Sequence, residues 1–270
     1  MSGPRANGEF PRLDPRWIAG LCLLALLLCS LFVASAQTGV PPESQSIAAA
    51  LIKWLPLVFS GFLFNLLVSV LSMALGTAAG VMLGLGLISE RTALRTACAG
   101  AMQFFRNAPW LVLLFYAMFL IPFKIALLGE SIPFPDWIKA VIGLALPVMA
   151  NVAEIVRGGI VSIPLGQWQS ARSLAFTRSQ ILWLIIIPQA VKRMIPPWMN
   201  LYAILTMATP LISIVGVQDG LTMTRSALVA EGRPELFLPM YLVLLAMFFA
   251  YCYPIALGTS VLERRVETQG

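Results

Sequence analysis

Long apolar stretches that carry almost no charge limit what this sequence can fold into. Of the 270 residues, 59% are hydrophobic and 11% are charged, whereas ordinary globular proteins have about 45–50% apolar and about 25% charged residues. A helix needs about 20 mostly apolar residues to cross the hydrocarbon core of a bilayer. The sequence therefore predicts an all-α integral membrane protein.

Six stretches are expected to form transmembrane helices. They are Trp17–Ala36, Leu55–Ile88, Arg95–Ile121 with an interruption at Asn107–Pro109, Trp137–Ile160, Pro197–Val217 and Phe237–Leu262. Ile181–Ile187 is too short to span and precedes Pro188, so it is interpreted as an interfacial or re-entering segment. Residues 1–54 would hold an N-terminal segment, the first helix and an outer linker, and residues 55–265 the main transmembrane domain.

The first stretch allows two interpretations. Basic residues, an apolar run and Ala34-Ser35-Ala36 also describe a cleavable secretory signal. A membrane anchor is preferred because the apolar run is longer than in most signals. Either choice leaves every later loop on the same side of the membrane.

The positions of the basic residues predict the orientation. With the N-terminus in the cytoplasm, 13 of the 18 Lys and Arg residues lie inside, as the positive-inside rule requires. The outside keeps Lys53, Lys124, Lys139, Arg225 and Arg233. Both termini are therefore expected in the cytoplasm. The cations that give the net charge of +6 are scattered at the ends of apolar runs, which does not favour nucleic-acid binding.

Several kinds of chemistry are excluded by residues that the sequence lacks. It contains no histidine, which rules out Ser-His triads, Cys-His dyads and His-metal sites. The four cysteines lie in apolar surroundings and form no C-x-x-C pair. No concentrated set of nucleophile, base or metal ligands occurs, so neither a catalytic site nor a bound metal is expected.

Three glycines recur at every fourth position of the second stretch. Gly76, Gly80 and Gly84 share one helix face, and such small residues let another helix backbone approach closely. This spacing predicts tight helix packing, either inside the subunit or between two subunits.

The segment at residues 161–196 is long, of mixed polarity and expected inside. Within it, Gln167–Phe176 is predicted as a short amphipathic helix. One face would carry Trp168, Ala171, Leu174 and Ala175, and the other Gln169, Arg172 and Ser173. From periodicity alone, such a helix could equally lie on the membrane or dock into the groove of a partner.

Several ordered motifs resemble a known family. Residues 169–175, Gln-Ser-Ala-Arg-Ser-Leu-Ala, with Pro188-Gln189-Ala190 after them, resemble the cytoplasmic E-A-A-x-x-x-G loop of ATP-binding cassette (ABC) importer permeases. Residues 104–109, Phe-Phe-Arg-Asn-Ala-Pro, and residues 153–160, Ala-Glu-Ile-Val-Arg-Gly-Gly-Ile, are similar to strings of the polar amino acid permeases, of histidine, glutamine, glutamate and arginine type. The resemblance covers residues 61–262.

The resemblance implies a five-helix permease core that pairs with a second, identical or homologous permease subunit. It also implies two cytoplasmic ATPase subunits, an extracytoplasmic solute-binding protein and a bacterial cytoplasmic membrane. In this family the loop helix inserts into the ATPase, a role that maps onto Gly166, Gln169, Ser170, Ala171, Arg172 and Ala175. The chain contains no phosphate-binding loop, so ATP would be used by the partner and no cofactor is expected here.

The chain departs from the family pattern at several positions. Gln169, Ser170 and Ala175 replace the glutamate, the first alanine and the glycine of the loop motif. Residues 207–211, Met-Ala-Thr-Pro-Leu, stand where the family often has a charged pair before Thr-Ser-Leu. Pro210 is expected to kink the fifth helix, because it removes a backbone donor.

Polar side chains at membrane depth are candidates for the translocation path, because they are costly unless they face a cavity or a partner. Asn151, Glu154 and Arg157 share a face of the fourth stretch, and Thr209 is a further candidate; Asn65, Ser69 and Thr206 are weaker ones. The alternative for Glu154 and Arg157 is that they pair within their helix. For the hydroxyl and amide groups, the alternative is a bond to a nearby carbonyl. A secondary transporter that uses Glu154 for proton coupling is the rival function.

Overall fold

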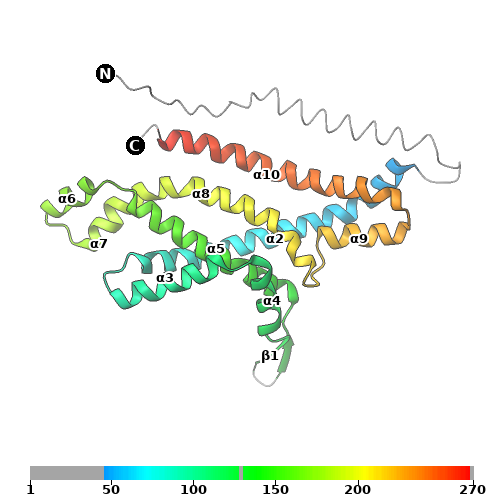
Figure 1. Ribbon diagram of the computed structural model, residues 1–270, viewed down its shortest axis with the longest axis horizontal. Coiled ribbons are helices and arrows are strands. Elements are labelled where there is room, and N and C mark those ends of the chain that lie inside the picture. The colour runs from blue at the N-terminus through cyan, green and yellow to red at the C-terminus, as the bar shows by residue number, and fades with distance from the viewer. Residues whose placement is uncertain (1–45, 128–129, 268–270) are drawn as a thin grey trace.

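The computed structural model describes residues 46–127 and 130–267, so the first predicted helix, at residues 17–36, lies outside the described part. The described chain is a bundle of long helices along its longest axis (Figure 1). Its elements are α2 (Ile47–Leu87), α3 (Thr92–Asn107), α4 (Trp110–Leu120), β1 (Lys124–Leu127), β2 (Glu130–Pro133), α5 (Asp136–Val161), α6 (Leu165–Ser173), α7 (Arg178–Gln180), a π-helical turn (Ile181–Ile186), α8 (Ile187–Ala208), a 3-10 turn (Thr209–Ser213), α9 (Gly220–Glu231), a second 3-10 turn (Pro234–Leu236) and α10 (Phe237–Glu267). α6 and α9 lie at opposite ends (Figure 1).

Three described helices are long and apolar enough to cross a membrane, which confirms the all-α membrane class. They are Ile47–Leu87, Asp136–Val161 and the run Pro234–Arg264 that includes most of α10. α2 begins at Ile47, earlier than the predicted Leu55, and Ser46 caps it by accepting a hydrogen bond from the backbone N–H of Ala49 at 3.2 Å. α5 matches its predicted bounds to within one residue at each end, whereas α10 begins at the predicted Phe237 but extends beyond the predicted Leu262 to Glu267.

The predicted interruption of the third stretch is confirmed. α3 ends at Asn107 and α4 begins at Trp110, with Ala108 and Pro109 in extended conformations between them. Proline explains the break, because its ring disfavours a helical conformation in the residue before it.

The predicted bounds of the fifth stretch were wrong. Ile181–Ile186 is not a separate interfacial piece, because its π-helical turn continues directly into α8. Pro188 lies where the π-helical turn passes into α8, and Pro196 and Pro197 lie further inside α8, so the continuous helix accommodates all three prolines. α8 ends at Ala208, and Pro210 lies in the tighter 3-10 turn Thr209–Ser213. The expected irregularity at Pro210 is therefore confirmed.

Several described elements were not predicted, and the largest of them are a β-hairpin and α9. A short antiparallel hairpin, β1 with β2, follows α4. α9 begins after Asp219, whose carboxylate accepts a hydrogen bond from the backbone N–H of Thr222 at 2.9 Å, and it ends before Gly232, which has a φ of 62°. An aspartate N-cap and a left-handed glycine C-cap are recognisable in sequence, so these two residues could have predicted α9.

The glycine face of α2 packs inside the subunit, against α5. A Cβ atom added to Gly76 would lie 2.5 Å from Val148 Cγ1, and one added to Gly84 would lie 2.7 Å from Val156 Cβ. Both distances are far below van der Waals contact, so side chains larger than hydrogen cannot fit at the present helix separation. Of the two predicted possibilities, the structure shows packing within the subunit.

The other half of α2 contacts α9 through a buried polar network. A Cβ atom on Gly61 would lie 2.8 Å from Gly220 Cα. One turn further along α2, Asn65 donates to Thr209 Oγ1 and to Asp219 Oδ2, both at 3.1 Å, and accepts from the backbone N–H of Gly220 at 2.8 Å. Asn65, Thr209 and Asp219 are fully buried. The network satisfies groups that would otherwise be costly to bury.

Gly80→Ala is expected to destabilise the protein. The new Cβ would lie 2.6 Å from Val152 Cβ and 2.7 Å from the carbonyl oxygen of Met149, and neither atom can move without separating the two helices. Overpacking of this kind costs about 2 kcal/mol, more than the roughly 1 kcal/mol that alanine gains in helix propensity. Thermal unfolding of the purified protein in detergent measures the loss.

Gly100→Ala is the matched control. Gly100 lies within α3, and apart from its chain neighbours and the backbone of its own helix no atom lies within 4 Å of its added Cβ. Its melting temperature should stay unchanged or rise. Equal melting temperatures for Gly80→Ala and the unaltered chain would show that the α2–α5 contact is not tight.

Candidate functional site

α6 projects at one end of the bundle and exposes most of the residues expected to couple to an ATPase (Figure 1). Gly166, Gln169, Ser170 and Arg172 are exposed, and Ala171 is buried. The predicted apolar face was wrong at its C-terminal end, because α6 ends at Ser173 and leaves Leu174 and Ala175 exposed outside the helix. Of this predicted face, only the half-buried Trp168 and the buried Ala171 pack toward the rest of the protein.

Contacts at both ends hold α6 in place. Before it, Arg193 of α8 donates to the carbonyl oxygen of Ser162 at 2.7 Å. After it, Thr177 caps α7 in a reciprocal capping box with Gln180. Ala171 itself joins the buried apolar cluster that includes Ile181 and Ile186. The helix is therefore anchored by one buried alanine and by its flanks, and its outer surface is free for another molecule.

The turn after α6 explains the glycine in the family pattern. Ala175 has a φ of 59°, in the left-handed region that glycine adopts most readily. There its N–H donates to the carbonyl oxygen of Arg172 at 2.9 Å, and the N–H of Phe176 donates to that of Ala171 at 3.3 Å. These two bonds close the C-terminus of α6. Alanine forms the same turn at a steric cost.

Ala175→Gly should stabilise this turn by about 1 kcal/mol, because glycine removes the Cβ clash of the left-handed conformation. Hydrogen exchange of the α6 amides in the purified protein measures the change as greater protection. Ser170→Gly, an exposed position inside α6, is the control and should lower protection. If Ala175→Gly does not increase the protection of the α6 amides, residue 175 does not adopt the left-handed conformation in solution.

A polar pocket of about 760 Å³ lies near the same end of the bundle, between α3 and α5. It is lined by residues of α2, α3 and α5: Leu87, Arg95, Thr96, Ala99, Met102, Gln103, Arg106, Asn107, Glu154 and Arg157. Two of the predicted path residues, Glu154 and Arg157, are thus in its wall. Asn151 and Thr209 are not among the lining residues.

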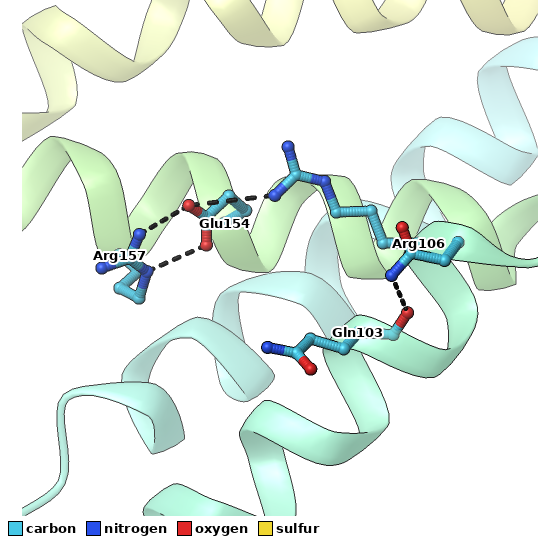
Figure 2. A network of polar contacts seen from close by, with 5 residues as sticks. Gln103, Arg106, Glu154 and Arg157 are labelled. Atoms are coloured by element: carbon cyan, nitrogen blue, oxygen red, sulfur yellow. Dashed lines mark hydrogen bonds and ion pairs between the residues drawn. The ribbon is translucent and has the colours of Figure 1, made fainter.

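Among the described residues, Glu154 is the only anion in the wall of this pocket, and it faces two arginines (Figure 2). Its Oε1 accepts from Arg157 Nη2 at 2.6 Å, and its Oε2 accepts from Arg157 Nε at 2.9 Å. Arg106 Nη1 of α3 lies 3.9 Å from Oε1. The pairing within α5 is therefore present, yet both partners remain open to the pocket, with side-chain exposures of 25% for Glu154 and 41% for Arg157.

The other polar candidates donate to nearby helix carbonyls. Asn151 donates to Pro147 O at 2.8 Å, Thr206 to Tyr202 O at 2.9 Å, and Thr209 to Thr206 O at 2.8 Å. Ser69 donates to Leu66 O at 2.8 Å. These bonds are the alternative that the sequence left open, and Asn65 instead bonds across to α9.

Seven residues of α3 line the pocket and none of them was proposed for the path; they include the cations Arg95 and Arg106 and the amide Gln103. A pattern in the sequence could have identified these residues. Arg95, Ala99, Gln103 and Arg106 recur at three- and four-residue spacing, so they share one face of a helix. The arrangement of α3 beside α5, which brings this face to Glu154, could not be deduced from spacing alone.

Lys139, one of the five cations predicted for the outer side of the membrane, lies in the first turn of α5. Its side chain is fully buried. Its Nζ lies 3.4 Å from the centre of the Phe123 ring and 3.1 Å from Asp136 Oδ1. A cation over an aromatic face and beside a carboxylate offsets part of the cost of burial.

The described residues form a bundle of membrane-crossing helices with an open polar pocket and an exposed loop helix, features that are typical of a membrane transport subunit. Comparison with known proteins identifies the family. The chain belongs to the family described as binding-protein-dependent transport system inner membrane component, whose sequence profile matches residues 76–268.

Individual relatives agree with this assignment. The chain is 31% identical over 214 residues to the probable amino-acid ABC transporter permease protein YckA of Bacillus subtilis, covering 79% of this chain and 91% of the relative. It is 29% identical to the glutamate/glutamine/aspartate/asparagine transport system permease protein BztC of Rhodobacter capsulatus, covering 95% of this chain and 58% of that protein.

A solved structure has the same fold. The crystal structure of an amino acid ABC transporter with histidines superposes with a TM-score of 0.71 at 26% identity, covering 83% of this chain and all of the matched chain. The chain is therefore a permease subunit of the ABC importer class. The rival assignment as a secondary transporter finds no support among these relatives.

Proposed function

We propose that this chain translocates polar amino acids that an extracytoplasmic binding protein delivers, while a separate ATPase hydrolyses ATP. The observation that carries the proposal is the family match over residues 76–268, joined to amino-acid permeases among the relatives. The open pocket beside Glu154 supports it, because a polar solute needs a polar route through apolar helices.

In this proposal α6 is the mechanical contact with the ATPase. It is exposed at the end of the bundle, it is held at both flanks, and its outer residues include the cation Arg172. Gln169, where the family pattern has glutamate, keeps hydrogen-bonding capacity and loses a charge. The end of the bundle that carries α6 is accordingly cytoplasmic, the end that carries α9 is extracytoplasmic, and both termini are cytoplasmic.

A second permease subunit completes the route. The walls of the polar pocket come only from α2, α3 and α5 among the described elements. A pocket with walls on one side needs a partner surface to become a closed path. A homologous or identical subunit related by two-fold symmetry supplies such a surface.

Glu154 and Arg157 are the proposed contacts to the solute. An amino acid carries an ammonium group and a carboxylate, which match a glutamate and an arginine in charge. Arg106, 3.9 Å from Glu154, adds a second cation for the carboxylate. Both members of the pair are partly exposed to the pocket, so each is accessible to a solute that enters it.

Glu154→Gln is expected to lower ATP-dependent uptake by at least about tenfold, the loss expected when a hydrogen bond to a charged group disappears. The double exchange Glu154→Arg with Arg157→Glu keeps an ion pair on α5 but reverses the order of its charges. Uptake should stay low in this variant, although its melting temperature matches that of the unaltered chain. Proteoliposomes that contain the whole complex provide the measurement.

Recovery of uptake in the double exchange would contradict the path role. It would show that only the ion pair within α5 matters, since the pocket would then present its charges in the opposite order.

The function as a whole is tested with Arg172→Glu. The unaltered chain should purify with an ABC ATPase, and uptake should require ATP and a binding protein. Reversing the charge at Arg172 should weaken ATPase association by at least about tenfold, because a glutamate cannot donate the hydrogen bonds that the exposed guanidinium offers to a partner. Membrane insertion should not change.

Arg225→Glu is the control, because it changes the net charge by the same amount as Arg172→Glu. Arg225 is exposed on α9, at the opposite end of the bundle, so ATPase association should remain. Uptake driven by a proton gradient in liposomes that contain this chain alone would overturn the proposed function.

A further inference from the structure

A second groove, separate from the polar pocket, opens on the surface where α2 ends. Its volume is about 620 Å³. Its walls come from the last turns of α2, the first turns of α3 and the chain from Arg178 to Trp183. None of its lining residues lines the polar pocket, so the proposed path leaves it unused.

The apolar part of the groove presents side chains that water would not favour. Met82 is 76% exposed, Trp183 57% and Leu94 47%. α2 is a membrane-crossing helix that ends at Leu87, so Met82 lies near the limit of its apolar run. Tryptophan is enriched at this level of membrane proteins, where an apolar ring meets the headgroups. The apolar wall is therefore placed to contact lipid chains.

The polar rim of the groove carries an unbalanced positive charge. Arg178 pairs with Glu90, and it also donates to the carbonyl oxygen of Ile88 at 2.7 Å. These two opposite charges cancel. Arg91 also lines the groove and is exposed, and among residues 46–127 and 130–267 no partner for its guanidinium is found. One cation thus remains at the boundary between the apolar wall and water, with Ser89 and Ser179 beside it in the lining.

We propose that this groove binds an anionic phospholipid. The phosphate lies at Arg91, with the serine hydroxyls as further donors, and an acyl chain lies along Met82, Leu94 and Trp183. A lipid with one net negative charge balances the single unpaired cation, which a zwitterionic lipid does not. Basic pockets between transmembrane helices at the membrane surface bind such headgroups by this combination of charge and apolar contact.

The occupant is a membrane lipid and not a soluble phosphate. A free phosphate would satisfy Arg91 but would leave the exposed Met82 and Trp183 without a contact. The phosphate of a lipid is tied to acyl chains, so a single molecule covers both parts of the groove.

Quenching of Trp183 fluorescence by brominated lipids tests the proposal. The full chain is reconstituted in phosphatidylcholine vesicles that contain a minor fraction of either brominated phosphatidylglycerol or brominated phosphatidylcholine. The Trp183 signal is taken as the difference between the unaltered chain and Trp183→Phe. At the same lipid fraction, brominated phosphatidylglycerol should quench the Trp183 signal more strongly than brominated phosphatidylcholine, as expected if phosphatidylglycerol were about fivefold enriched at the groove. One cation near the membrane surface is expected to give an enrichment of this size.

Substitutions at the N-cap of α3 and within its first turn test whether Arg91 causes the preference for the anionic lipid. Arg91→Gln should abolish it, and Arg91→Lys should retain most of it. Arg95→Gln is the control, since Arg95 lies one turn further along α3 and lines the polar pocket instead; it should retain the preference. Quenching by brominated phosphatidylcholine should be the same in all variants, which shows that each is folded and inserted.

Three results would overturn the proposal. Equal quenching of the unaltered chain by the two lipids would show no selectivity for charge. Absence of quenching by either lipid would show that another protein surface covers the groove. Loss of the preference on addition of inorganic phosphate would show that the site binds a soluble anion.

Discussion

The close approach of α2 and α5 is the contact on which the other features depend. Between apolar helices in a membrane the hydrophobic effect supplies little attraction, so close packing of backbones has to hold them. Three glycines of α2 permit this, at Gly76, Gly80 and Gly84, against the valines of α5. α3 then packs on this pair through a cluster that joins Met102 to Leu87 and Ala153. Only with α5 held in this way do Glu154 and the arginines of α3 face one pocket.

Polar groups at membrane depth fall into two kinds that differ in how completely they are satisfied. Asn65, Thr209 and Asp219 are fully buried and bond to one another, so their network fastens α9 to α2 and to the end of α8. Glu154 and Arg157 bond to each other and remain partly exposed. A complete network gives rigidity, whereas a pair with remaining donors and acceptors can bind a solute. This difference separates structural from proposed functional residues better than residue type does.

Two exposed features of the bundle, α6 and the groove beside Arg91, differ in polarity. α6 presents a mostly polar surface and is anchored by Ala171, which suits contact with a water-soluble partner. The groove beside Arg91 combines apolar walls with one unpaired cation, which suits the membrane interface. The left-handed alanine at residue 175 closes the end of α6 with a conformation that glycine adopts more readily.

The sequence by itself determined the membrane class, the ends of α5, the break at Pro109 and the irregularity at Pro210, because apolar length and proline act locally. Periodicity also placed three glycines on one face of α2 and Glu154 beside Arg157. Only the tertiary structure decided what those faces contact. The glycines meet α5 of the same subunit, Thr209 is buried by Asn65, and Lys139 is covered by Phe123. The start of α8 was missed because the bundle accommodates prolines that would end an isolated helix. Contacts between segments far apart in the chain made these choices, and local patterns carry no information about them.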